Sequence, residues 1–236
     1  MDKTSTGRDN LVFNRVVTLR DTRDLEKNDI KQATQRNRGV VNIRKPAETL
    51  NSEPVEDIRR ASLRAATILS VQPHPEAENL LVCQVDCGDT SEDGKAAHPR
   101  TVVAGLAGKI PAEQLVGRKV LAITNLKPAK MRGIESTAML LAASDEKDGD
   151  METVELLQVP DFVPNGELMF FEGKEPSVPD AMLKSKGAIK AWERAKTCLR
   201  LNGDGEATYT DDSGTHRLCS TGGPIKAPTL TNAVIQ

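Results

Sequence analysis

Five short apolar runs, rich in β-branched residues, follow one another closely between residues 63 and 143. Segments rich in Pro, Gly, Asn and Asp separate them, and these residue types favour turns. Short runs of this kind at close spacing predict the strands of a small barrel or sandwich. The five runs are Leu63–Gln72, Leu80–Gly88, Arg100–Leu106, Lys119–Thr124 and Thr137–Ala143.

The connection between the third and fourth runs carries a helix signal. Pro111 suits the first turn of a helix, and Gly117 suits its end. Five strands with a short helix between the third and fourth fit the five-stranded OB barrel. We therefore predict a mainly β chain with an OB-fold barrel over residues 56–145.

The segments on either side of this region differ from it in composition. Residues 1–55 are polar, with only short apolar islets that offer little to offset the entropy of ordering. We expect this segment to be a mostly disordered N-terminal tail. Residues 146–236 are expected to form a small α+β unit, with strands at Val154–Val159 and Gly166–Phe171 and a helix within Ala181–Leu201.

The expected helix has an apolar face and a basic face. An apolar stripe at helical spacing predicts the side that packs on the core, and its members are Met182, Ile189, Trp192, Ala195 and Leu199. Cations repeat every fourth residue beside it, at Lys186, Lys190 and Arg194. This basic row is either a solvated face or a contact with nucleic acid.

A loop with three cations joins the fourth and fifth apolar runs. It places Lys127, Lys130 and Arg132 between two predicted strands, with Pro128 to stiffen the loop and Gly133 to permit a sharp return. Loops between strands display binding groups because strand side chains are committed to the core. We interpret the loop as a site that binds an anionic polymer, and not as a catalytic site.

The overall charge does not by itself indicate nucleic-acid binding, because the formal net charge is −2 and the pI is about 6.0. Exposed charges interact over only about 8–10 Å at physiological salt. The local excess of cations in the loop therefore matters more than the sum over the chain.

Several other classes of function have no sequence signal. Cys83 and Cys87 alternate with polar residues, which places both on the inward face of a strand rather than in a metal site. The histidines lie in no nucleophile motif, and no Gly-rich phosphate loop is present. We expect no catalytic residues, no metal and no cofactor. No apolar run reaches the length of a membrane span or forms a signal peptide, so we expect a cytoplasmic protein without membrane contact.

Three segments carry a resemblance to the EMAP-II-type tRNA-binding domain: LRAATILSVQPHPEAENLLVCQVDCG, RTVVAGL and NLKPAKMRGIESTAM. This domain occurs in cofactors of multisynthetase complexes and is appended to some aminoacyl-tRNA synthetases. The likeness runs from about Asp57 to the C-terminus. It implies a barrel docked on its own C-terminal unit, and hence no homodimer formed through the barrel.

The resemblance also implies site residues and partners. By motif position, the candidate tRNA contacts are Asn125, Lys127, Lys130, Arg132, Ser136 and Met139. Possible auxiliary contacts are Arg64, Arg118, Lys119 and Lys190. The implied partners are tRNA and aminoacyl-tRNA synthetases or other subunits of their complex.

Two functional hypotheses follow, and a third is disfavoured. The first is a noncatalytic cofactor that delivers or retains folded tRNA for partner synthetases, with little sequence specificity. The alternative is a scaffold of a multisynthetase complex whose RNA binding is secondary. A general single-strand binder is disfavoured, because residues 61–146 contain no Phe, Tyr or Trp on which bases could stack.

Overall fold

The computed structural model describes residues 57–91, 93–95, 97–145 and 153–236. The predicted N-terminal tail lies outside these described residues. Contacts divide the chain after Leu50, and every described residue belongs to the second compact unit, Asn51–Gln236. The described part is mainly β, with one α-helix.

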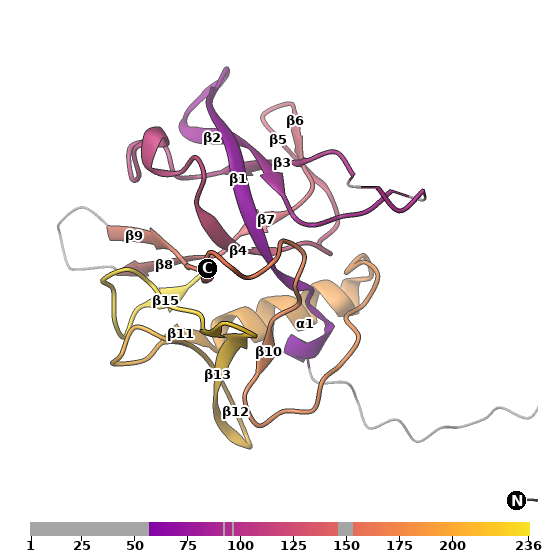
Figure 1. Ribbon diagram of the computed structural model, residues 1–236, viewed down its shortest axis with the longest axis vertical. Coiled ribbons are helices and arrows are strands. Elements are labelled where there is room, and N and C mark those ends of the chain that lie inside the picture. The colour runs from indigo at the N-terminus through magenta and orange to yellow at the C-terminus, as the bar shows by residue number, and fades with distance from the viewer. Residues whose placement is uncertain (1–56, 92, 96, 146–152) are drawn as a thin grey trace, which may run out of the picture. The chain divides into compact units, whose positions relative to one another are not determined.

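The first sheet has five antiparallel strands and curls into a half-barrel (Figure 1). We use the name half-barrel for this sheet, whose strands follow the order β3-β2-β1-β4-β7. Its strands are β1 (Leu63–His74), β2 (Ala77–Asp86), β3 (Arg100–Ala104), β4 (Lys119–Ile123) and β7 (Met139–Leu140). Short 3-10 helices precede β1 at η1 (Asp57–Arg60) and precede β4 at η2 (Ala112–Gln114). The helix predicted after Pro111 is thus a single 3-10 turn.

The central strands of the half-barrel are buried on both faces. In β1, Leu63 and Ala65 belong to one hydrophobic cluster, whereas Ala66 and Ile68 belong to the other. A register irregularity after Ile68 bends the strand. Strand β4 alternates in the same way between the two clusters. Because strand side chains alternate between faces, one cluster fills the half-barrel and the other joins it to the C-terminal unit.

The second sheet contains most of the C-terminal unit, which we define as residues 153–236. It runs in the order β10-β13-β12-β11-β15-β8-β9, with β14 paired to β13. Its strands are β8 (Ala142–Asp145), β9 (Thr153–Leu156), β10 (Phe170–Phe171), β11 (Leu199–Leu201), β12 (Ala207–Asp211), β13 (Gly214–Ser220), β14 (Gly223–Pro224) and β15 (Val234–Ile235). The division into domains at residue 145 stays a prediction, because both parts contribute to one cluster.

The fifth predicted strand is split between the two sheets. The sequence predicts one strand over 137–143, but β7 pairs with β4 whereas β8 pairs with β9 and β15. The backbone of Leu141 lies between them and is itself fully buried. This segment therefore links the half-barrel to the C-terminal unit.

Helix α1 (Lys186–Thr197) is capped by Ser185, whose Oγ accepts a hydrogen bond from the Ala188 N–H at 3.1 Å. The predicted apolar stripe is wrong in part. Met182 and Ile189 are 43% and 41% exposed. The buried face instead consists of Ala188, Ala191, Trp192 and Ala195.

Candidate nucleic-acid interface

The cationic loop folds into a two-stranded hairpin of its own, which we call the cationic hairpin. It consists of β5 (Ala129–Met131) and β6 (Ile134–Ser136), with Lys130 opposite Glu135. The turn residues Arg132 and Gly133 both have positive φ, 48° and 91°. Two positive φ values in a two-residue turn match the twist of the flanking strands. The hairpin therefore turns sharply and carries its cations at or next to its tip.

The three cations of the hairpin segment are exposed and unpaired. Lys127, Lys130 and Arg132 all have exposed side chains. None of them forms an ion pair or a side-chain hydrogen bond with another described residue. Arg132 also adopts a left-handed conformation that a non-glycine residue seldom takes. A strained position that displays a free guanidinium at a tip is typical of a functional site.

The hairpin is anchored at its base by Arg100. Arg100 Nε and Nη2 donate to the two carboxylate oxygens of Asp89 at 2.6 and 2.9 Å. Its Nη1 donates to the carbonyl oxygens of Thr124 and Thr137, at 2.6 and 2.9 Å. These two carbonyls lie just before and just after the hairpin. One guanidinium therefore fixes both ends of the loop to strand β3.

The ion pair also shifts the pKa values of its members. The hydrogen bond from Arg100 holds the pKa of the Asp89 carboxyl below its usual range, although burial opposes this shift. The hydrogen bond to Asp89 likewise raises the pKa of the Arg100 guanidinium. Sequence reasoning missed this pair. The available signal was an acid after the second predicted strand and a base at the start of the third.

His74 holds one strand of the hairpin. Its Nδ1 accepts a hydrogen bond from the Glu76 N–H at 3.1 Å, so Nε2 carries the hydrogen and donates to the Met131 carbonyl at 3.1 Å. The residue as a whole is buried, with 5% of its surface exposed. The β1–β2 turn therefore supports the hairpin.

Asn125 occupies a different place from the one predicted. It is buried, and its Oδ1 accepts from the Ser62 N–H at 2.9 Å. Its Nδ2 donates to the carbonyls of Arg60 and Asp180, both at 2.8 Å. Asn125 thus joins the start of the loop to both η1 and the C-terminal unit. Its side-chain amide is therefore not exposed to solvent, unlike the tRNA contact that the loop motif implied. Direct contact of Asn125 with tRNA stays a prediction.

Ser136 and Met139 also face inward. Ser136 is buried, and its Oγ accepts from the Val103 N–H at 3.0 Å and donates to the Ala138 carbonyl at 2.9 Å. Met139 is half-buried and packs against the cluster that joins the half-barrel to the C-terminal unit. We assign both residues to positioning the end of the loop, and their contact with tRNA stays untested.

The C-terminal unit brings a second group of cations to the loop. The Leu183 N–H donates to the Asn125 carbonyl at 2.7 Å, and Leu126 and Leu183 form an isolated β-bridge. The first turns of α1 follow at once, with exposed Lys186 and Lys190. Arg194, further along the predicted basic row, is instead paired with Asp57 at 2.7 Å. The row therefore offers lysines only at its N-terminal end.

The other auxiliary candidates do not gather at the hairpin. Lys119 Nζ donates to Asn165 Oδ1 at 2.7 Å, and so helps to hold the turn at 164–166. Arg118 precedes β4, whereas the cationic loop follows it. The ends of this strand lie roughly 13 Å apart. Arg64 is half-buried and its Nε donates to Ser62 Oγ at 2.9 Å. Contact with tRNA by these residues stays a prediction.

The described residues contain neither a metal-binding cluster nor a bilayer-spanning helix. No group of three or more His, Cys, Asp or Glu side chains is placed to hold a metal ion there. No described helix combines the length and the apolar character that crossing a bilayer requires.

Residues 63–168 match the family described as "Putative tRNA binding domain". This segment belongs to that family. The match covers the half-barrel, the cationic hairpin and the start of the C-terminal unit. It includes Arg100, Asp89 and His74, whereas the Asn125 partners Arg60, Ser62 and Asp180 lie outside it. The resemblance inferred from the loop motif is confirmed.

Relatives of the tRNA-binding domain include synthetases and a synthetase-complex protein. The chain is 43% identical over 157 residues to "Tyrosine--tRNA ligase, cytoplasmic" of Xenopus tropicalis, covering 66% of this chain and 28% of that protein. It is 36% identical over 194 residues to "Aminoacyl tRNA synthase complex-interacting multifunctional protein 1" of Cricetulus griseus, covering 82% of this chain and 49% of that protein. The chain thus spans less than half the length of either relative.

The fold has a solved counterpart. The C-terminal domain of Plasmodium vivax p43 matches with a TM-score of 0.66 and 27% identity, covering 77% of this chain and 100% of that domain. The counterpart therefore extends beyond the 63–168 segment into the C-terminal unit.

Proposed function

We propose that the chain is a noncatalytic tRNA-binding cofactor that delivers or retains folded tRNA for partner aminoacyl-tRNA synthetases. The observation that carries this proposal is the anchored cationic hairpin, with exposed Lys127, Lys130 and Arg132 that pair with no other residue in the described part of the chain. Cations on an anchored loop can neutralise phosphates without the entropy cost of ordering the loop on binding. Lys186 and Lys190 at the start of α1 are further exposed cations, on the helix that follows the contact between Leu183 and Asn125.

The surface suits folded RNA with little sequence specificity. Cations on a hairpin contact phosphates, and phosphate contacts carry no sequence information. Double-stranded RNA regions are recognised mainly by shape and backbone contacts. A weak general binder of this kind, joined to a synthetase, raises the apparent affinity for tRNA without new contacts in the enzyme. We place this activity in the cytoplasm, which the name of the tyrosine ligase relative also gives.

We further propose that the half-barrel is an OB fold. Two features support this assignment: the strand order, and a backbone hydrogen bond from the Thr137 N–H to the Thr101 carbonyl at 3.0 Å, which links β3 to the segment before β7. In such a barrel the hairpin is the loop between strands four and five, a place where OB folds bind nucleic acids. The packing of this face of β1 and β4 on the C-terminal unit supports the expectation that no homodimer forms through the barrel.

The salt dependence of tRNA binding tests the proposed function. If about four cations contact phosphate, log affinity should fall against log salt with a slope of about −3 to −4. The double variant Lys130→Ala/Arg132→Ala should bind more weakly, with a slope shallower by about 1.5. The matched control is Arg200→Ala/Lys226→Ala, which removes the same charge from exposed positions in the C-terminal unit. Equal effects of the two double variants would refute the assignment of the hairpin.

The scaffold alternative receives support from exposed apolar side chains in the C-terminal unit. Phe162 and Val178 are 78% and 92% exposed, and such residues can serve as contacts for protein partners. Purification of the synthetase complexes formed by Lys130→Ala/Arg132→Ala separates the tRNA-binding function from the scaffold function. Complexes that assemble normally but lose tRNA favour the cofactor; complexes that keep their tRNA favour the scaffold.

A further inference from the structure

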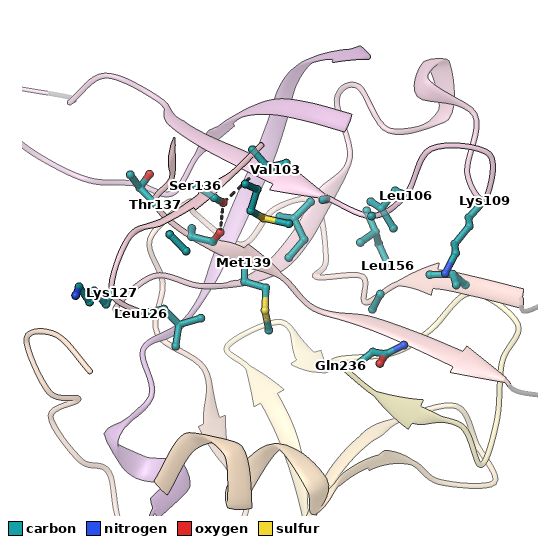
Figure 2. Close-up of a pocket in the computed structure, with 18 residues that line it drawn as sticks. Val103, Leu106, Lys109, Leu126, Lys127, Ser136, Thr137, Met139, Leu156 and Gln236 are labelled. Carbon is teal, nitrogen blue, oxygen red and sulfur yellow. Dashed lines mark hydrogen bonds between the residues drawn. The ribbon is translucent and has the colours of Figure 1, made fainter. Parts of the chain in front are cut away.

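A cavity of about 320 Å³ lies directly beneath the cationic hairpin (Figure 2). Residues from β3, the hairpin, β7 and β9 line it, and its walls are mostly apolar. Met139 is one of the residues at its border, and Figure 2 shows Lys127 at one end of the lining and Lys109 at the other. Its volume falls in the range of sites that bind small organic groups.

The cavity exists because β3 and β7 are not paired along their length. The Thr137 N–H donates to the Thr101 carbonyl of β3. Two residues further along β3, the Val103 N–H donates to the Ser136 hydroxyl and not to a backbone carbonyl. Beyond that point the two strands are not neighbours in the sheet order. The opening is therefore built into the strand arrangement, with its backbone donor capped by a side chain.

The lining favours a flat aromatic group that carries a negative charge. Two thioethers, Met131 and Met139, border the cavity, and methionine sulfur makes favourable contacts with aromatic rings. Leu126 and Leu156 add apolar surface. Lys127, which is exposed and unpaired among the described residues, supplies a cation at the rim. A nucleobase with its phosphate has this combination of properties.

We propose that this cavity receives one unstacked nucleobase of a bound RNA, while Lys127 contacts the adjoining phosphate. The proposal rests on the proposed function and specifies how the same site tells RNA from other polyanions. Single-stranded loops and ends of RNA present bases that can be splayed out and bound individually. The half-barrel, which lacks aromatic side chains for stacking, would hold such a base by enclosure.

Methionine methyl NMR tests the proposal directly on the full chain. Protein labelled with ¹³C at the methionine methyl groups is titrated with nucleoside monophosphates, folded tRNA and inorganic polyphosphate. We expect the Met131 and Met139 signals to move upfield with the nucleotides and tRNA, because they would lie against an aromatic ring. The signal of Met169, which is buried and does not line the cavity, should not move. Polyphosphate, which has no aromatic ring, should not produce this upfield shift.

A variant that narrows the cavity gives a second readout. Gly105 lines the cavity, and a Cβ added there meets no atom within 4 Å. Gly105→Leu should weaken tRNA binding by about fivefold or more, the loss of one enclosed base, without changing polyphosphate binding. The matched control is Gly203→Leu, at an exposed glycine with equally open space, which should leave both affinities unchanged.

The outcomes separate this inference from the proposed function. If tRNA binding depends on Lys130 and Arg132 but the Met131 and Met139 signals stay fixed, the base site is wrong and the proposed function stands. If mononucleotides shift neither methionine and Gly105→Leu binds tRNA normally, the base site is likewise refuted. If tRNA does not bind at all, both proposals fail.

Discussion

Arg100 joins both ends of the hairpin segment to β3, and its replacement by alanine removes four hydrogen bonds. Two connect it to Asp89 and two to the carbonyls of Thr124 and Thr137. A hydrogen bond to a charged group contributes about 1.5–3 kcal/mol. Because the paired side chains are 24% and 26% exposed, water replaces part of the loss. We expect Arg100→Ala to lower the free energy of unfolding by about 2–4 kcal/mol.

Urea unfolding followed by tryptophan fluorescence measures this change. Trp192 is the only tryptophan of the chain and is buried in the cluster that joins the half-barrel to the C-terminal unit. The variants Arg100→Ala and Asp89→Asn, alone and combined, form a double-mutant cycle whose coupling energy should exceed about 1 kcal/mol. A change in unfolding free energy below about 0.5 kcal/mol for Arg100→Ala would show that the anchor is not structural.

The same variant separates positioning from contact. Arg100→Ala should weaken tRNA binding, because the hairpin loses its fixed base. The slope of log affinity against log salt should stay as in the unmodified protein, because no phosphate contact is removed. A slope as shallow as that of Lys130→Ala/Arg132→Ala would instead identify Arg100 as a direct RNA contact and refute the reasoning.

The pH dependence of the unfolding free energy is an independent test of the Arg100–Asp89 pair. The pKa of Asp89 is lowered in the folded protein, chiefly by its hydrogen bond from Arg100. Its contribution to stability is therefore present above its unfolded pKa of about 3.9 and is lost as the pH falls through the lower folded value. Unfolding free energies measured between neutral pH and pH 3 should show this loss in the unmodified protein and a smaller one in Asp89→Asn.

Three further predictions concern backbone strain and thiol reactivity. Arg132→Gly should unfold at the same or a higher urea concentration, because φ of 48° suits glycine, while tRNA affinity falls; a marked loss of stability would argue against the left-handed turn. Gly88→Ala should destabilise the protein by about 3 kcal/mol or more. The φ of Gly88 is 67°, and the new Cβ would lie 2.2 Å from the backbone oxygen of Asn165. Unchanged urea unfolding would contradict this close contact. Burial raises the pKa of Cys83 to about 11 and of Cys87 to about 12. Mass spectrometry after alkylation at pH 8 should therefore find the half-buried Cys198 modified before them; early modification of Cys83 or Cys87 would contradict their burial.

The sequence by itself determined the strands of the half-barrel and the loop that carries the cations. Alternation with a period of two is a local property, so it correctly placed Cys83 and Cys87 on an inward face. The nearly continuous apolar character of β1 and β4 also has a local cause, since both faces of these strands are buried. Pro128 and Gly133 marked a loop with a sharp return, and the turn at Gly133 has the positive φ that only a few residues tolerate.

Only the tertiary structure decided which polar side chains face the solvent. Asn125 lies in the cationic loop by sequence, yet its amide is used up by Ser62, Arg60 and Asp180, which come from distant parts of the chain. The pairing of Arg100 with the loop ends depends in the same way on where separate segments meet. Residue spacing reports which face a side chain occupies, but its hydrogen-bond partners are set by the packing of segments far apart in sequence. The hairpin's anchors and the cavity beneath it are therefore properties of the folded chain.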